Sequence, residues 1–396
     1  MTETRPKILF LPKWYPHRQD PMPGLFVKNQ AEAVYRFCDV AVLYVHGDRD
    51  CPNSYEVDFT EENNVIVVRV YYKIPSLKIP LAGSFLKLFR FLKAYRLGFH
   101  LLTNFEPDIL HVHVLTRTGL IALIYRIFKR TPYIVSEHWS RYFPENNTYK
   151  GFLRKLLTRI IVRHSSALIP VSEKLKQAMI ANGLNNRQAF IIPNSVDMDR
   201  FVIPGNRNPR DKKKIIHVSC FEDKSKNITG FLHAVKFVLE KRSDFEVSII
   251  GEGPDFEYCR NAARDMGFNE DVVKFPGLKN DAEMAKIMGD TDFMVLSSNY
   301  ETFGTVVIES LACGTPVVAT AVGVVPEIIN EANGIITSPG DMQALGEAIM
   351  VMLDKCSTYD RKQIRETVRN KFSKEMVGLQ LYEIYSKILE PVRKHQ

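Results

Sequence analysis

Runs of apolar, β-branched residues alternate with amphipathic helical patterns along almost the whole chain, and this alternation limits the fold more than any other feature. Strand-like runs in the first half lie at residues 7–11, 40–46, 65–72, 108–113, 133–138, 167–172 and 190–193. Helical patterns separate most of them, at residues 26–37, 85–103, 115–128, 152–163 and 173–181. Near-continuous Val/Ile runs separated by helices indicate a parallel sheet covered on both faces.

The pattern breaks once, at residues 197–213, where a polar stretch rich in Pro, Gly and Asn is typical of a linker. Strand-like runs then resume at 215–219, 245–251, 272–275, 293–298 and 317–319, and from about residue 342 the pattern is helical. A chain of 396 residues is long enough for two domains. We therefore expect an α/β protein with two doubly wound, Rossmann-like domains and ligands in the cleft between them.

The charge is unevenly distributed. Residues 1–200 carry 28 basic and 17 acidic side chains (+11), which leaves 53 − 28 = 25 basic and 45 − 17 = 28 acidic ones (−3) for the rest. This asymmetry favours an anionic partner for the first half: nucleic acid, a membrane surface or a phosphorylated substrate.

Six scattered cysteines without a C-x-x-C pair indicate free thiols in a reducing compartment. No signal-peptide pattern and no run of 18 apolar residues is present, so the cytoplasm is the expected location.

The segment from Ser297 to Ala319 carries the clearest chemical signal. A strand-like run ends near Ser298 and a helical pattern begins near Gly304, which would leave the backbone N–H groups of Phe303, Gly304 and Thr305 without helical partners. Such groups and the helix dipole form an anion site suited to a diphosphate.

Two glutamates flank this helix start. Glu301 precedes it and Glu309 lies within its first turns, so both carboxylates can accept hydrogen bonds from sugar hydroxyls in one cleft. The alternative is two solvated glutamates at a helix end, with Glu301 favouring the dipole.

The spacing Glu301-x7-Glu309, followed by Ala-Cys-Gly-Thr-Pro-Val-Val-Ala-Thr at 312–320 and Gly323 with Pro-Glu at 326–327, resembles the retaining glycosyltransferases of family 4. Segments 193–197, 249–254, 273–277 and 372–389 resemble further parts of that family. The resemblance implies a GT-B fold, with an acceptor-binding domain at 1–200, a nucleotide-sugar-binding domain at 201–373, and a terminal helix at 374–396 that packs back on the first domain.

The resemblance also implies roles for single residues. Glu301 would contact the donor sugar and its developing charge, Glu309 the nucleotide ribose, and Lys226 the donor phosphates. Seen alone, Lys226 is an ordinary lysine near a helix start. Gly24 matches a flexible glycine loop before the first helix, and His138, at a strand end, matches a histidine near the reacting sugar.

Two departures from the family pattern stand out. Phe221 occupies a position where the family often carries an arginine, and Lys224 is the candidate replacement for that charge. The family's Gly-Gly before Pro-Glu is Gly323-Val324 here.

Two weaker signals remain. His111 and His113 leave the same face of a strand; a metal site would need further ligands, so we favour a strand-end pair that lines the crevice. Gly251-x-Gly253 alone is a weak hint of dinucleotide binding.

Residues 73–105 and 146–172 contain no acidic side chain. In the first stretch, Lys87, Arg90, Lys93 and Arg96 recur along one helical stripe beside Phe85, Leu88, Phe89, Leu92 and Phe99. Basic amphipathic helices of this kind suit an anionic lipid surface, although a solvated outer helix that packs its apolar side on a sheet has the same pattern.

We therefore expect metal-independent transfer of a hexose, with retention, from a UDP- or GDP-linked sugar to a glycan or lipid-linked acceptor, as in bacterial surface polysaccharide synthesis. The expected partners are the nucleotide-sugar, the acceptor and an anionic membrane face, and not nucleic acid. The alternatives are a sugar-nucleotide epimerase of the same fold and a catalytically silent protein that binds membranes or nucleic acid.

Overall fold

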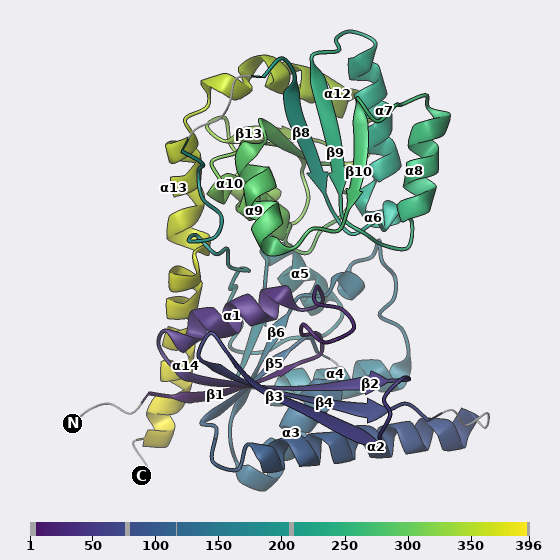
Figure 1. The fold of residues 1–396 in the computed structure, drawn as a ribbon. Helices are drawn as coiled ribbons and strands as arrows, with labels where there is room; N and C mark the ends of the chain where they lie inside the picture. Colours follow the sequence, from purple (N-terminus) through teal and green to yellow (C-terminus); the bar gives the residue numbers. More distant parts are fainter. Residues whose placement is uncertain (1–4, 76–79, 116, 206–209, 394–396) are drawn as a thin grey trace. The chain divides into compact units, whose positions relative to one another are not determined.

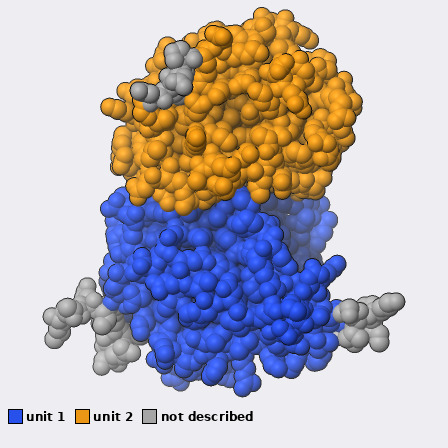
Figure 2. Space-filling model, in the orientation of Figure 1, with its two compact units in different colours: residues 1–195, 374–396 blue, residues 196–373 orange. Residues whose placement is uncertain are grey.

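The computed structural model describes residues 5–75, 80–115, 117–205 and 210–393. These residues form two compact units, coloured separately in Figure 2. Unit 1 comprises the described residues up to Ser195 together with those from Lys374 onward, and unit 2 comprises the described part of Val196–Ser373. In the expected division the first boundary followed residue 200, and the second followed residue 373.

Unit 1 is built on a seven-stranded sheet in the order β3-β4-β2-β1-β5-β6-β7. All neighbouring strands are parallel except β3 and β4. The strands are β1 (Lys7–Pro12), β2 (Asp39–Asp48), β3 (Tyr55–Glu62), β4 (Val65–Lys73), β5 (Ile109–His113), β6 (Tyr133–Glu137) and β7 (Ala167–Pro170). The helices are α1 (Leu25–Tyr35), α2 (Pro80–Leu101), α3 (Arg117–Lys129), η1 (Ser140–Tyr142), α4 (Phe152–His164), α5 (Glu173–Ala181) and α14 (Lys374–Arg393) (Figure 1).

Unit 2 contains a six-stranded, wholly parallel sheet in the order β10-β9-β8-β11-β12-β13. Its strands are β8 (Lys213–Val218), β9 (Phe245–Ile250), β10 (Val273–Gly277), β11 (Phe293–Leu296), β12 (Val317–Thr320) and β13 (Gly334–Thr337). Its helices are α6 (Asp223–Lys226), α7 (Ile228–Leu239), α8 (Phe256–Asp265), α9 (Asp281–Asp290), α10 (Thr305–Ala312), α11 (Val325–Ile328), α12 (Met342–Lys355), η2 (Cys356–Thr358) and α13 (Arg361–Phe372).

Helix α14 returns to unit 1 and packs against α1, as the family resemblance implied. Gly378 permits the close approach, because a Cβ there would lie 2.3 Å from the carbonyl oxygen of Ala33. Lys374 pairs with Glu32 at 2.5 Å, and Val377, Leu381 and Tyr385 are buried in the core of unit 1.

The predicted helices of unit 1 and most of the predicted strands are present, and three segments differ. Residues 190–193 form no strand, and the edge strands β3 and β13 were not predicted. Strand β3 alternates polar and apolar residues on a solvated edge, so it lacks the apolar run that marks a buried parallel strand. Residues 206–209 of the expected linker lie outside the described residues.

All six cysteines are free thiols. Within the described ranges, no helix combines the length and the apolar character that crossing a bilayer requires.

Candidate functional site

The loops after β8 and β11 in unit 2 bring Lys226 and Glu301 together. Strands β8 and β11 are neighbours, so their carboxyl ends meet at one edge of the sheet. The Ser297 hydroxyl donates to the carbonyl oxygen of Lys226 (2.9 Å), and the backbone N–H of Asn299 donates to the carbonyl oxygen of Ser225 (2.8 Å). These bonds fix α6 beside the loop that carries Glu301.

The two side chains form an ion pair. Lys226 Nζ lies 2.6 Å from Glu301 Oε1, and the Ser298 hydroxyl donates to the same oxygen at 2.8 Å. The exposed fractions of the two side chains are 17% and 11%. Burial, the largest single cause, lowers the pKa of Lys226, but the charge and hydrogen bond of Glu301, with the charges of Cys220 and Glu222, together outweigh burial and hold that pKa above its ordinary value. The ammonium group is therefore charged at neutral pH.

Helix α10 begins immediately after this pair. Gly304 is its N-cap with φ of 96°, a left-handed conformation that favours glycine, and Thr305 is its first residue. Phe303 is buried, and its carbonyl oxygen accepts a hydrogen bond from the N–H of Val324 (3.0 Å). The positive end of an eight-residue helix thus lies next to the Lys226–Glu301 pair.

Gly323 sets how closely the next loop approaches this site. A Cβ at Gly323 would lie 2.5 Å from the carbonyl oxygen of Phe303 and 2.9 Å from Cβ of Glu301. The single glycine of the altered Gly323-Val324 pair is therefore required for packing, and Val324 is buried.

Glu309 lies on α10 and has a perturbed carboxyl. Burial, assisted by the charge of Asp281 and opposed by Arg200, raises the pKa of Glu309 to about 8. No described residue forms a hydrogen bond with this carboxyl.

Phe221 takes no part in a cationic site, because its ring is fully buried in the core of unit 2. It packs edge-on against Phe256, with ring centroids 4.8 Å apart. Lys224 lies nearby on α6 and is exposed. Phe221 cannot supply the positive charge that an arginine often provides at this position in the family, so Lys224 remains the candidate for it.

In unit 1, Gly24 and His138 have well-defined surroundings. Gly24 is the N-cap of α1 with φ of 78°, and a Cβ there would lie 2.2 Å from the carbonyl oxygen of Trp14. His138 is buried with its ring 4.4 Å from that of Phe26, and burial lowers its pKa to about 3. His138 is therefore a neutral imidazole at physiological pH.

The expectation that His111 and His113 line a crevice is wrong. Both are fully buried, and their ring centroids are 4.0 Å apart on the same face of β5. His111 bonds to Tyr385 through Nδ1 and to Ser136 through Nε2, each at 2.7 Å, so it is a core histidine that ties α14 to the sheet. Across residues 5–75, 80–115, 117–205 and 210–393, no three potential ligand side chains gather as a metal site would require.

Lys224, Lys226, Glu301, Phe303, Gly304, Thr305 and Glu309 belong to unit 2, whereas Gly24 and His138 belong to unit 1. Sequence reasoning did not single out Ser298, which supports Glu301, or the buried His217, whose Nε2 lies 3.0 Å from the Ser297 hydroxyl. Ser297 and Ser298 follow the β11 run directly, so their position at a strand's carboxyl end was the available signal.

Two α/β units, each built on a predominantly parallel sheet, match the GT-B fold of glycosyltransferases. Comparisons with known proteins agree. Residues 26–200 match the sequence family described as Glycosyltransferase Family 4, and residues 199–371 match Glycosyl transferases group 1. The chain belongs to the family 4 glycosyltransferases, and it is an enzyme of that class.

Individual proteins agree with this assignment. An uncharacterized glycosyltransferase of Methanocaldococcus jannaschii is 26% identical over 340 residues, which cover 85% of this chain and 88% of that protein. Sucrose-phosphate synthase from Thermosynechococcus elongatus superposes with a TM-score of 0.77 at 20% identity, over 97% and 100% of the two chains. HepE of Anabaena, solved with UDP and glucose, has a TM-score of 0.70 at 17% identity, over 96% and 99%.

Proposed function

We propose that this enzyme transfers a hexose, with retention of configuration, from a UDP- or GDP-linked sugar to a lipid-linked or glycan acceptor. The observation that carries the proposal is the Lys226–Glu301 pair, 2.6 Å apart at the start of α10. A cation beside a helix N-terminus suits a diphosphate that gains charge as the glycosidic bond breaks. HepE, which was solved with UDP and glucose, supports a nucleoside diphosphate donor.

In this proposal each group has a distinct task. Lys226 and the N–H groups at the start of α10 stabilise the departing diphosphate. Glu301 accepts hydrogen bonds from the donor sugar and faces its developing positive charge. Because Lys226 and Glu301 are paired without ligand, the donor must share or displace that ion pair when it binds. Glu309 accepts the ribose hydroxyls.

The surface of unit 1 supports an acceptor at an anionic membrane face. Helix α2 exposes Phe85 (73%), Leu88, Phe89 and Leu92 beside Lys87, Arg90, Lys93 and Arg96. The alternative, in which these apolar side chains pack on the sheet, applies instead to Phe91, Ala94 and Tyr95, which are buried. We therefore place the enzyme at the inner face of a membrane, in the synthesis of a bacterial surface polysaccharide.

The test begins with the donor. Nucleoside diphosphates and their sugars are screened for thermal stabilisation, since a ligand that binds the folded state raises Tm with its occupancy. The anomeric configuration of the product is then followed by proton NMR with the donor that binds best. We expect the product to keep the donor's configuration; an inverted product contradicts retention.

Two further outcomes would favour the alternatives. Epimerisation of the donor sugar without an acceptor would indicate an epimerase. The absence of stabilisation by any nucleoside diphosphate would indicate a catalytically silent protein.

We also propose that no metal ion is needed, because Lys226 and the start of α10 supply positive charge at the diphosphate. Turnover is expected to be unchanged in EDTA. Loss of turnover in EDTA, restored by Mg²⁺ or Mn²⁺, would contradict this and indicate a metal-bridged diphosphate.

A further inference from the structure

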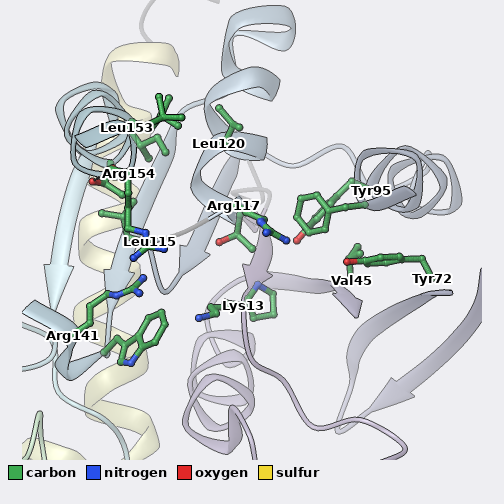
Figure 3. A pocket seen from close by; sticks show the side chains of 17 residues that line it. Lys13, Val45, Tyr72, Tyr95, Leu115, Arg117, Leu120, Arg141, Leu153 and Arg154 are labelled. Atoms are coloured by element: carbon green, nitrogen blue, oxygen red, sulfur yellow. Dashed lines mark hydrogen bonds between the residues drawn. The ribbon is translucent and has the colours of Figure 1, made fainter. Parts of the chain in front are cut away.

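A cavity of about 590 Å³ opens in unit 1 at the carboxyl ends of its central parallel strands (Figure 3). Pro12 ends β1, Leu115 follows β5 and Trp139 follows β6; all three line the cavity, and side chains of α2, α3 and α4 complete its wall. Ligands of doubly wound folds bind at this edge of the sheet. None of the donor-site candidates of unit 2 lines this cavity.

Four cationic side chains line the cavity: Lys13, Arg117, Arg141 and Arg154. No acidic residue lines it, and in the described part of the chain none of the four forms an ion pair. The buried carboxylate of Glu137, which does not line the cavity, already accepts hydrogen bonds from the N–H groups of Leu115, His138 and Trp139 and from the Tyr142 hydroxyl. The charge of Glu137 acts on Lys13 and Arg141 without forming an ion pair with either, so a single carboxylate offsets only part of the charge of four cations.

Arg141 and Lys13 carry the desolvated part of this charge, whereas Arg117 and Arg154 are exposed. The residue is 9% exposed, its Nε is buried without a hydrogen-bond partner in the described residues, and its guanidinium stacks 3.7 Å over the ring of Trp139. Lys13 Nζ lies 3.5 Å over the same ring. Burial, reinforced by Arg141, lowers the pKa of Lys13 to about 8. Buried cations without anions are costly, so an anionic ligand would stabilise this arrangement.

Apart from Thr118 and Thr158, the rest of the cavity lining is apolar. Val45, Tyr72, Tyr95 and Leu120 line it, and Leu153 lies at its edge on α4 (Figure 3). Outside the cavity, α3 and α4 expose large apolar side chains, chiefly Ile127 (67%), Phe128 (81%) and Phe152 (83%). A site that is cationic on one side and apolar on the other fits an amphiphile with an anionic head.

We propose that this cavity binds the phosphate or diphosphate group of a lipid-linked acceptor, with the lipid chain along the exposed apolar surface of α3 and α4. Arginine guanidinium groups match phosphate oxygens in paired hydrogen bonds, and three arginines converge here. A soluble sugar phosphate would satisfy the cations but leave the apolar surface uncovered. This inference rests on the proposed transferase function and specifies its acceptor.

Binding is measured by calorimetry with farnesyl diphosphate, a small isoprenyl diphosphate, kept below its micelle concentration. Every titration contains saturating UDP, and a parallel set uses the Lys226→Ala protein, so that the donor site cannot account for the signal. We expect Arg141→Gln and Arg154→Gln each to weaken binding about ten- to hundredfold, as for a lost charged hydrogen bond. Arg163→Gln, on α4 but outside the cavity, is the matched control and should bind like the native protein.

The same titration with inorganic diphosphate isolates the contribution of the lipid. We expect it to bind at least tenfold more weakly than farnesyl diphosphate. Equal affinities would overturn the lipid assignment in favour of a soluble phosphorylated acceptor. Absence of farnesyl diphosphate binding, or an equal loss in Arg163→Gln, would overturn the site itself.

Two measurements keep these outcomes separate from folding and from the donor site. Arg154 is exposed, so its substitution should leave the melting temperature unchanged even if that of the buried Arg141 does not. UDP binding to Arg141→Gln should equal that of the native protein. If UDP fails to bind any variant, the donor proposal fails while the cavity titration in the Lys226→Ala protein still stands.

Discussion

The cationic side chains of the two candidate sites differ in whether the protein itself provides a paired carboxylate. In unit 2, Lys226 and Glu301 neutralise each other at 2.6 Å. In unit 1, Lys13, Arg117 and two further arginines line one cavity without a carboxylate among them. A self-neutralising pair is stable without ligand and must be opened or shared when a diphosphate binds. A set of like charges is instead relieved by an anion, so binding itself stabilises that site.

The largest expected effect comes from removing the basic side chains of α2 in unit 1. Replacing Lys87, Arg90, Lys93 and Arg96 with Gln should reduce binding to anionic vesicles roughly 10³-fold at low salt. Each charge near such a surface contributes about 1 kcal/mol, and salt screens the attraction. Co-sedimentation with anionic and with neutral vesicles measures this, and donor hydrolysis in solution should be unchanged.

The control removes the same number of charges from unit 2. Lys236, Lys355, Lys362 and Lys371 are all exposed there, and their replacement with Gln should leave vesicle binding intact. An equal loss in both variants would mean that net charge, and not the α2 surface, attracts the protein to the membrane. A native protein that ignores anionic vesicles at low salt would favour a soluble acceptor.

The second test breaks the neutral pair of unit 2. Lys226→Ala should lower kcat roughly 10²–10³-fold, or about 2.7–4 kcal/mol, as for the loss of one preorganised charge stabiliser. The loss also leaves the largely buried Glu301 carboxylate without its cation, so a lower Tm is expected. Steady-state kinetics test the effect, with Lys236→Ala, exposed on α7, as control. Near-normal turnover of Lys226→Ala would remove Lys226 from the mechanism and direct attention to Lys224.

The same two sites differ in how far the sequence could predict them. Lys226 and Glu301 lie in motifs with a recognisable order, so their roles could be expected, but their direct contact could not. That contact depends on β8 and β11 being neighbours, which is a property of strand order. Local patterns along the chain do not encode which strands pair, so they cannot predict a contact between two residues that lie 75 positions apart.

The unit 1 cavity was not predicted, although one of its cations, Arg154, lies in the stretch 146–172, which contains no acidic residue. Lys13, Arg117 and Arg141 follow β1, β5 and β6, and single basic residues after strands carry no signal by themselves. The three strands are neighbours in the sheet, so their carboxyl ends collect these side chains. The expectation that His111 lines a crevice was wrong for the opposite reason. The spacing of His111 and His113 is visible in the sequence, but the burial of His111 against Tyr385 depends on α14 returning to unit 1.

The third test concerns Glu309 in unit 2, whose carboxyl forms no hydrogen bond with the described residues. At pH 9, where most of the Glu309 carboxyl is ionised, Glu309→Ala should raise the Kd of the free nucleoside diphosphate about ten- to hundredfold, because a hydrogen bond to a charged group contributes about 1.5–3 kcal/mol. Calorimetric titration measures it, and kcat at saturating donor should change little. An unchanged Kd would mean that Glu309 does not hold the ribose.

The smallest expected effect is a change in ligand affinity of at most about tenfold between pH 7 and pH 9. It compares the two units most directly, because Glu309 and Lys13 both have pKa values of about 8. Burial is the first cause of each shift; Asp281 and Arg200 also act on Glu309, and Arg141, Glu137, Arg117 and Arg154 on Lys13. If the ribose binds the Glu309 carboxylate, affinity for a nucleoside diphosphate should rise as pH goes from 7 to 9 and the carboxyl loses its proton. If the cavity anion binds charged Lys13, affinity for farnesyl diphosphate should fall over the same range as Lys13 is neutralised. The phosphates themselves are mostly ionised above pH 7, so they contribute little to either slope.

Calorimetry in buffers of different ionisation enthalpy adds a second readout: at pH 8, nucleotide binding should release protons and lipid diphosphate binding should take them up. Glu309→Gln should remove only the first pH dependence and Lys13→Gln only the second. Two slopes of the same sign, or slopes that persist in these variants, would show that the carboxyl of unit 2 and the amine of unit 1 do not act on their ligands as proposed.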